Sequence, residues 1–263
     1  MTQHIHRFDN KAVIITGGAG GIGLYTAIRL ASEGAKVALV DVAEEGLKKA
    51  KKQLLESVSG AEVITCVADV SNEDDVKAYV AATLEAFGSI DGFFNNAGID
   101  GKRFPLPEYT PEEFERVMTI NSTGVFLGLK HVLEQMEKQG SGAIVNTASI
   151  GGILGWSSQY GYIASKHAVV GMTRAAAAEF ACKGLHINAV APGGIKTPMA
   201  ADAMRKLNPE DPEAAERQFA AGIPAGRMGT PDEIAGVVAF LLSEDAAFIN
   251  GQILVVDGGQ TCQ

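Results

Sequence analysis

The sequence predicts one doubly wound α/β domain built on a seven-stranded parallel sheet. Short apolar runs alternate with stretches of helical periodicity from near the start of the chain to within ten residues of its end. Most of these runs are apolar throughout, as expected for parallel strands covered by helices on both faces. No Pro/Ser-rich linker or break in composition divides the 263 residues. We therefore expect a single domain over residues 1–263.

Seven runs are the expected strands, and they lie at residues 11–16, 35–41, 62–70, 91–96, 142–149, 185–192 and 252–257. Helical patterns fill the intervals between them. The exception is the segment at about 195–222, which is rich in Met, Ala and charged residues and holds no strand pattern. Because this segment follows the end of a strand, it is predicted to be a lid over a substrate site.

Composition and charge exclude several classes of protein. The chain is 46% hydrophobic and 20% charged, which is typical of a globular protein. Its net charge is −9, and no stripe of Lys and Arg could neutralise a phosphate backbone, so no nucleic-acid partner is expected. No targeting segment and no window long enough to span a membrane is found, which predicts a cytoplasmic protein without a membrane partner.

The cysteines indicate neither a disulfide framework nor a metal site. Cys66, Cys182 and Cys262 are odd in number and far apart, without the spacing of metal ligands. We expect reduced thiols and no metal. Cys66 falls in an apolar run and is expected in the core.

A glycine-rich turn, Thr16 to Gly23, follows the first strand and opens a helix. In that position Gly17, Gly20, Gly21 and Gly23 let the backbone N–H groups approach a pyrophosphate closely. The same glycines without a strand before them and a helix after them would indicate only a flexible turn. The turn therefore predicts a dinucleotide site of the Rossmann type.

Asp41 stands at the end of the second strand, eighteen residues after Gly23. A carboxylate there can accept hydrogen bonds from the ribose hydroxyls of the adenosine and would repel a 2′-phosphate. No Arg or Lys in the turn or directly after Asp41 could hold such a phosphate. We therefore expect NAD(H) rather than NADP(H). Asp41 as the N-cap of the next helix is an alternative compatible with this role.

Tyr162 and Lys166 are four residues apart, so on a helix they share one face, and Ser149 precedes Tyr162 by thirteen residues. Hydride transfer to a ketone places growing negative charge on oxygen, which needs a proton donor. A phenol with a pKa near 10 becomes a better donor when a neighbouring ammonium stabilises its phenolate. Ser149 can hydrogen-bond the same oxygen. These residue types predict a catalytic site for carbonyl reduction or alcohol oxidation.

The motif T-G-x-x-x-G-I-G, followed in order by Asp41, Ser149, Tyr162 and Lys166, resembles the short-chain dehydrogenases/reductases from Thr16 almost to the end of the chain. The resemblance implies that Asn121 holds a water of the proton relay and that Tyr162 and Lys166 also contact the cofactor. It implies further cofactor contacts at Ile22, Val42, Asp69, Val70, Asn95, Ala97, Gly98, Pro192, Gly193, Ile195 and Thr197. Gly20 departs from the Ser found in many members, which removes one donor to the phosphate.

Within this family, the segments GFFNNAGIDGK and GSGAIVNTAS are similar to those of NAD-dependent alicyclic ketone reductases of the levodione reductase type. The similarity implies a small cyclic ketone as substrate. It also implies substrate contacts at Asp100, Ile150, Ile153, Trp156, Met199 and Met204, of which the apolar ones could equally be core or interface residues. Family members are usually homotetramers, and the small residues of RAAAAEFA on the helix of Tyr162 would permit close packing between subunits.

Four alternatives remain open from the sequence, of which three concern the substrate and one the class of protein. A hydroxysteroid, a sugar or a 3-oxoacyl thioester could replace the cyclic ketone, since the shape of the pocket depends on the lid. A non-catalytic NAD-binding protein of the same fold is an alternative of another class. The complete set of Asn121, Ser149, Tyr162 and Lys166 argues against it, because a binding protein needs only part of that set.

Overall fold

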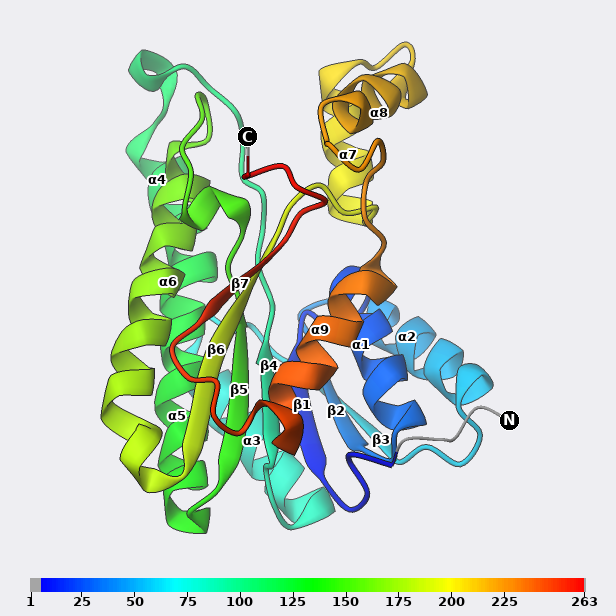
Figure 1. Ribbon diagram of the computed structural model, residues 1–263, viewed down its shortest axis with the longest axis vertical. Helices are drawn as coiled ribbons and strands as arrows, with labels where there is room; N and C mark the ends of the chain where they lie inside the picture. The colour runs from blue at the N-terminus through cyan, green and yellow to red at the C-terminus, as the bar shows by residue number, and fades with distance from the viewer. Residues whose placement is uncertain (1–5, 263) are drawn as a thin grey trace.

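The computed structural model describes residues 6–262 and contains a single sheet of seven parallel strands (Figure 1). Along the sheet the strands follow the order β3-β2-β1-β4-β5-β6-β7. They are β1 (Ala12–Thr16), β2 (Lys36–Asp41), β3 (Val63–Val67), β4 (Gly92–Asn95), β5 (Gly142–Thr147), β6 (Leu185–Pro192) and β7 (Ile253–Val256). Each lies within one of the seven predicted runs, so the predicted fold class is confirmed.

The two halves of the sheet meet at β1 and β4, which pair through Val13 with Gly92 and Ile15 with Phe94. From β1 the chain adds β2 and β3 on one side, and from β4 it adds β5, β6 and β7 on the other. Connections from neighbouring strands therefore leave in opposite directions at this point. In open α/β sheets, such a switch point opens a crevice at the carboxyl ends of the strands.

Helices cover both faces of the sheet. The hydrophobic clusters place α1, α2 and α9 on one face and α3, α5 and α6 on the other, and α4 packs against α6. Their bounds are α1 (Gly21–Ser32), α2 (Glu44–Ser57), α3 (Glu73–Phe87), α4 (Pro111–Met118), α5 (Gly124–Gln139), α6 (Tyr160–Phe180), α7 (Pro198–Leu207), α8 (Pro212–Ala221) and α9 (Pro231–Leu242). No helix within residues 6–262 is long and apolar enough to cross a membrane.

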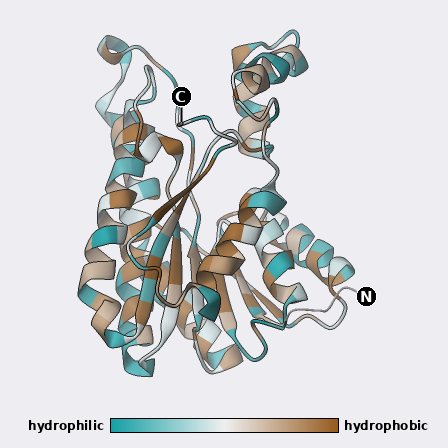
Figure 2. Cartoon of the chain, in the orientation of Figure 1, coloured by the Kyte–Doolittle hydropathy of each residue, from teal (hydrophilic) through white to brown (hydrophobic). Residues whose placement is uncertain are grey.

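The apolar core lies along the central strands, which carry most of the hydrophobic residues of the sheet (Figure 2). β1 and β4 are buried along their whole length, whereas the edge strands β3 and β7 are only partly covered. Cys66 lies on β3 and is half-buried rather than in the core as predicted, because an edge strand has a neighbour on one side only.

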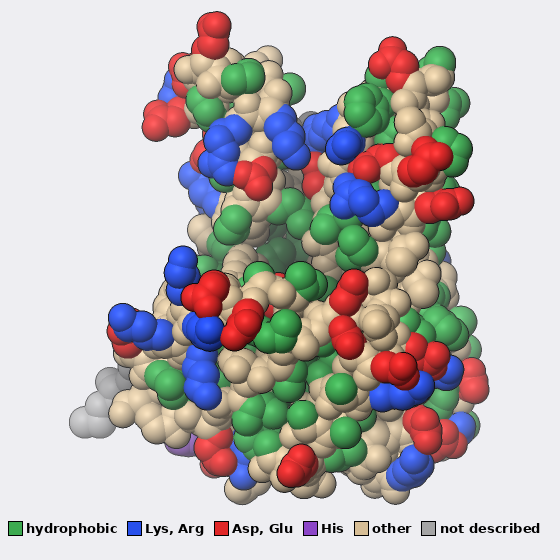
Figure 3. Space-filling view, turned by 180° about the vertical axis from the view of Figure 1, so that it is seen from behind, with side chains coloured by type: hydrophobic (Ala, Val, Ile, Leu, Met, Phe, Trp, Pro, Cys, Tyr) green, Lys and Arg blue, Asp and Glu red, His purple; other side chains and the backbone are tan. Residues whose placement is uncertain are grey.

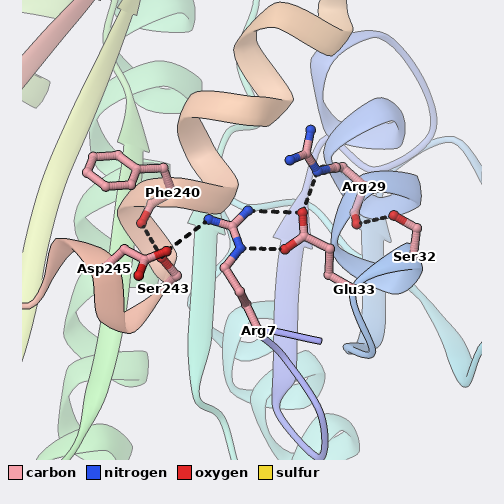
Figure 4. A network of polar contacts seen from close by, with 7 residues as sticks. All are labelled: Arg7, Arg29, Ser32, Glu33, Phe240, Ser243 and Asp245. Atoms are coloured by element: carbon pink, nitrogen blue, oxygen red, sulfur yellow. Dashed lines mark hydrogen bonds and ion pairs between the residues drawn. The ribbon is translucent and has the colours of Figure 1, made fainter. Parts of the chain in front are cut away.

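A charged network ties the start of the described chain to the C-terminal ends of α1 and α9 (Figure 4). The nearly buried Glu33 carboxylate, at the end of α1, accepts hydrogen bonds from Arg7 at 2.6 and 2.9 Å and from Arg29 at 2.5 Å. Arg7 also reaches Asp245, just after α9. Burial alone would raise the pKa of Glu33, but its bonds to the two guanidinium groups together lower the pKa more. The pKa of Glu33 therefore lies below its ordinary value, and the carboxyl group is ionised at neutral pH.

Candidate active site

Three positions of the glycine-rich turn exclude a side chain, through backbone conformation or through crowding. Gly17 and Gly21 have φ of 67° and 52°, which side chains rarely adopt. A Cβ at Gly23 would lie 2.2 Å from the carbonyl oxygen of Gly17. Gly20 instead faces open space, and no side chain caps α1, which starts here. The turn thus has the exposed backbone and the helix N-terminus that a pyrophosphate requires.

Asp41 ends β2 and is held by two backbone groups. Its Oδ2 accepts a hydrogen bond from the amide of Ala19 at 3.1 Å, and its Oδ1 accepts one from the amide of Ala43 at 3.0 Å. The N-cap of α2 is Ala43, so the alternative in which Asp41 caps this helix is wrong. Val42 beside it is 65% exposed. The carboxylate is fixed next to the glycine-rich turn, where a ribose bound by that turn would lie.

Further predicted residues follow the carboxyl ends of β3 and β4, on the same side of the sheet as the glycine-rich turn. Asp69 forms a turn by accepting hydrogen bonds from the backbone amide and hydroxyl of Ser71, and Val70 is buried. Asn95 is buried and donates to Val125 and Asn146, so its side chain braces the sheet. The amide of Ala97 donates to the hydroxyl of Thr16 and joins this segment to the glycine-rich turn.

Asn96 was not among the predicted site residues, although it adjoins Asn95 in the same motif. Its side-chain amide donates to the Thr16 carbonyl at 3.0 Å and accepts from the Thr147 hydroxyl at 3.1 Å. Asn96 therefore links the ends of β1, β4 and β5. Its signal in the sequence was its place at the end of a predicted strand, between the predicted contacts Asn95 and Ala97.

The segment after β6 also reaches the glycine-rich turn. A Cβ at Gly193 would lie 2.7 Å from that of Asp257, so Pro192 and Gly193 pass closely beside the end of β7. Ile195 is buried and bridges to Gly229. Thr197 caps α7 by accepting a hydrogen bond from the amide of Ala200 at 3.1 Å, and its Cγ2 would lie 3.7 Å from a Cβ at Gly21.

The four predicted catalytic residues converge at the ends of β4 and β5. The buried Lys166 ammonium donates to the Thr147 carbonyl at 2.8 Å and lies 5.7 Å from the ring centre of Tyr162. A hydrogen bond joins Ser149 to Tyr162. A Cβ at Gly98 would lie 3.1 Å from Oδ1 of Asn121 and 3.6 Å from the Lys166 nitrogen, so the absence of a side chain at Gly98 leaves room for both groups.

Asn121 lies in a π-helical turn (Thr119–Thr123) between α4 and α5. Such turns often mark functional sites. The Asn121 side chain exchanges hydrogen bonds of 2.8 and 2.9 Å with the backbone of Ile99 and donates to the hydroxyl of Ser165 at 3.2 Å. It therefore fixes the segment after β4 against α6, the helix that carries Tyr162 and Lys166.

Burial controls the protonation of the two titratable groups in the site. It raises the pKa of Tyr162 to about 12, against a smaller lowering by the hydrogen bond with Ser149. Burial also lowers the pKa of Lys166 to about 8. The sequence predicts a Tyr162 pKa lowered by the neighbouring ammonium. In this structure Lys166 is not among the groups that lower it, and desolvation outweighs the lowering by Ser149 and Arg103, so Tyr162 carries its proton. A protonated phenol is the form needed to donate to a carbonyl oxygen.

The predicted substrate residues fall into separate groups. Ile150 is buried, whereas Ile153 and Trp156 are partly exposed on the loop before α6, and the rings of Trp156 and Tyr162 lie 6.5 Å apart. Asp100, on the segment after β4, accepts a hydrogen bond from Gln159, a buried residue that the sequence analysis missed.

Met199 and Met204 lie on α7, and only Met199 is exposed. Met204 lines a cavity of about 630 Å³ together with Gly20, Gly21 and Thr197, beside the glycine-rich turn. That cavity does not include Trp156. α7 and α8 rise beyond the strand ends opposite α4, and the surface is hollowed between these raised parts (Figures 1 and 3).

Within residues 6–262, no group of three or more His, Cys, Asp or Glu side chains could hold a metal ion.

Comparison with known proteins agrees with this geometry. A family model described as enoyl-(acyl carrier protein) reductase matches residues 17–261. The chain is 54% identical to levodione reductase of Leifsonia aquatica, over 97% of this chain and 96% of the relative. The chain belongs to the short-chain dehydrogenase/reductase family. It is also 40% identical to cyclohexanol dehydrogenase of Acinetobacter sp. (strain SE19), over 97% of each chain.

Solved structures show the same relationship. The crystal structure of levodione reductase superposes with a TM-score of 0.96 and covers 97% of this chain and 99% of its own. That of NAD⁺-bound xylitol dehydrogenase, 39% identical, superposes with a TM-score of 0.91 over 96% of this chain and 100% of its own. The predictions of family, of an oxidoreductase and of NAD(H) as cofactor are confirmed, as is the similarity to alicyclic ketone reductases.

Proposed function

We propose that this short-chain dehydrogenase/reductase interconverts a small cyclic ketone and its secondary alcohol with NAD(H). The observation that carries the proposal is the convergence of Ser149, Tyr162 and Lys166 at the strand ends, beside an Asp41 that suits NAD(H). Two of the similar proteins are named for six-membered ring substrates, levodione and cyclohexanol.

Each residue has a distinct role in the proposed reaction. Bound NADH supplies the hydride to the carbonyl carbon. Tyr162 donates its phenolic proton to the carbonyl oxygen, and Ser149 hydrogen-bonds the same oxygen as negative charge develops. Lys166 contacts the ribose of the nicotinamide and stabilises the phenolate that remains. Asn121, fixed by Ile99 and Ser165, holds the water through which Tyr162 is reprotonated.

Cofactor binding is assigned to the residues around the glycine-rich turn. Gly17, Gly20, Gly21, Ile22 and Gly23 receive the pyrophosphate at the start of α1. Asp41 and Val42 face the adenosine ribose, and Asp69 and Val70 flank the adenine. The remaining contacts to the cofactor and its nicotinamide half are assigned to Asn95, Ala97, Gly98, Pro192, Gly193, Ile195 and Thr197.

The substrate site is assigned to the space between Tyr162 and the segment at about 195–222. In the structure this segment carries α7 and α8, which stand over the strand ends. We propose that they act as the lid and that Met199 meets the substrate on closure. The hollow beside α7 leaves room for such a movement (Figure 3).

A sugar alcohol is the second candidate substrate, because xylitol dehydrogenase is 39% identical over its whole chain. A screen of NADH consumption with cyclic diketones, steroid ketones, ketoses and 3-oxoacyl thioesters separates the candidates. The proposal predicts the highest kcat/KM for the cyclic diketones. A higher kcat/KM for a ketose or for a 3-oxoacyl thioester would contradict the proposal and make that compound the better candidate substrate.

A homotetramer in the cytoplasm completes the proposal. On α6, Gly171, Ala175 and Ala178 are small and exposed, as close helix packing between subunits requires. Cys66, Cys182 and Cys262 are free thiols, as in a reducing compartment. Sedimentation equilibrium tests the assembly, and Ala175→Glu is expected to give smaller species.

A further inference from the structure

Gln159 is a buried amide whose two ends bind different segments. Its residue is 2% exposed. The Trp156 indole N–H donates to its Oε1 at 2.5 Å, and its Nε2 donates to Oδ1 of Asp100 at 2.6 Å. Asp100 follows β4 and Trp156 follows β5, so Gln159 fastens two loops that are far apart in the sequence. Breaking one of these bonds would leave a buried polar group unpaired, which is costly.

The backbone around Gln159 supports this arrangement. Ser158, directly before it, has φ of 69°, a conformation that non-glycine residues rarely adopt. The Ser158 carbonyl accepts a hydrogen bond from the amide of Phe104 at 3.0 Å, which is a second link between the same two loops. Gln159 occupies the N-cap position of α6 but its side chain does not cap the helix. The side chain is therefore committed to Asp100 and Trp156.

Both residues held by Gln159 lie close to Tyr162. The Trp156 ring lies 6.5 Å from the Tyr162 ring at an angle of 34°. Although burial is the main cause of the raised pKa of Tyr162, the charge of Asp100 contributes to it. The second carboxylate oxygen of Asp100 lies 3.5 Å from Arg103, on the outer side of the segment. Asp100 and Trp156 thus form one wall beside the proton donor.

We propose that Gln159 is a positioning residue that holds Asp100 and Trp156 together as one wall of the substrate pocket beside Tyr162, and that this wall selects cyclic over open-chain ketones. The inference rests on the proposed function. A rigid indole face complements the flat side of a six-membered ring. An open-chain ketone gains less from that face because it must lose torsional freedom to lie on it.

The test compares cyclohexanone with 2-hexanone, two ketones of six carbons, in the wild type and in Gln159→Leu. We expect KM for cyclohexanone to rise about tenfold in the variant, with kcat changed less than about twofold. The preference for cyclohexanone, as the ratio of kcat/KM values, should fall by a similar factor. The matched control is Gln135→Leu on α5, whose side-chain amide donates to Gln139 on the same helix. It should leave both KM values unchanged.

A second readout does not depend on turnover. Trp156 is the only tryptophan of the chain, so its fluorescence reports directly on the bond to Gln159. In Gln159→Leu we expect the emission maximum to shift to longer wavelength as the freed indole turns toward water. An unchanged emission maximum together with an unchanged substrate preference would overturn the inference, as would a loss of kcat at constant KM.

Gln159→Glu keeps the inference testable if the Leu variant does not fold. At neutral pH the new carboxylate would repel the carboxylate of Asp100 and so separate Asp100 from Trp156. Its protonated form can donate a hydrogen bond to Asp100 as the amide does. KM for cyclohexanone should therefore fall toward the wild-type value as the pH is lowered, and a pH-independent KM defect would contradict the inference. Absence of ketone turnover in the wild type would refute the proposed function, while the emission shift in Gln159→Leu would still measure the contact.

Discussion

The Lys166 ammonium is anchored to the carbonyl oxygen of Thr147, the last residue of β5, at 2.8 Å. This bond joins the helix that carries Tyr162 to the end of a central strand, so the Lys166 nitrogen is held in place by the sheet. The residue is only 4% exposed, and burial lowers the pKa of its ammonium to about 8. The position proposed to serve the reaction is therefore one that costs folding free energy at neutral pH.

Lys166→Met is expected to be inactive and yet to gain stability relative to the wild type at neutral pH. Between pH 8 and the ordinary value of 10.5, unfolded wild type binds more protons than folded wild type, so its stability rises with pH over this range. The change amounts to on the order of 3 kcal/mol. The Met variant has no titrating group at this position and therefore lacks this pH-dependent change in stability. Urea unfolding at pH 7 and pH 10 should show that the free energy of unfolding of the wild type rises relative to that of the variant at the higher pH. The same difference in free energy at both pH values would contradict the prediction.

Tyr162→Phe should lower kcat by at least about a hundredfold, because the variant keeps the ring but has no proton to donate. NADH binding should stay within about twofold of the wild type, since the backbone of the glycine-rich turn is untouched. Quenching of Trp156 fluorescence by NADH measures the binding. Full activity in this variant would refute the proposed proton path.

The wild type should use NADH at least about tenfold better than NADPH, because the Asp41 carboxylate repels a 2′-phosphate. Asp41→Ser should narrow this preference and also weaken NADH binding, since the bonds to Ala19 and Ala43 are altered. The preference is measured by comparing the rates with NADH and with NADPH in the same assay. Glu44→Ser removes a nearby exposed carboxylate and is the control. Equal rates with NADPH in the wild type would show that Asp41 does not select the cofactor.

Glu33→Gln should destabilise the protein by about 2 kcal/mol, because Arg7 and Arg29 lose their buried counter-charge. The pKa of Glu33 is lowered in the folded state, so its contribution is complete above the ordinary value near 4.5 and is lost as the pH falls through the lowered one. The cost of the substitution should therefore shrink in acid. Urea unfolding at pH 7 and pH 3 checks this. Glu62→Gln, an exposed partner of Lys36, should have almost no effect.

The sequence predicted the sheet well, since seven apolar runs separated by stretches of helical periodicity admit few other folds. It also predicted the convergence of Ser149, Tyr162 and Lys166, because parallel strands bring their carboxyl ends to one edge. What it could not predict depends on partners distant in the sequence. Gln159 gave no signal, since its role follows from the position of Asp100 in space. The half-burial of Cys66 follows from β3 being at the edge, which the strand pattern does not reveal.

The uniform direction of the strands also affects how the chain must fold. Without hairpins in the sheet, every pair of neighbouring strands forms across an intervening helix, and the pairing of Val13 with Gly92 closes a loop of almost eighty residues. Closing such loops costs chain entropy before any contact repays it. We therefore expect slow refolding, with β1 and β2 associating before β4 joins them. Until β4 arrives, one side of β1 is an open apolar edge, and the nascent chain is then most prone to aggregate.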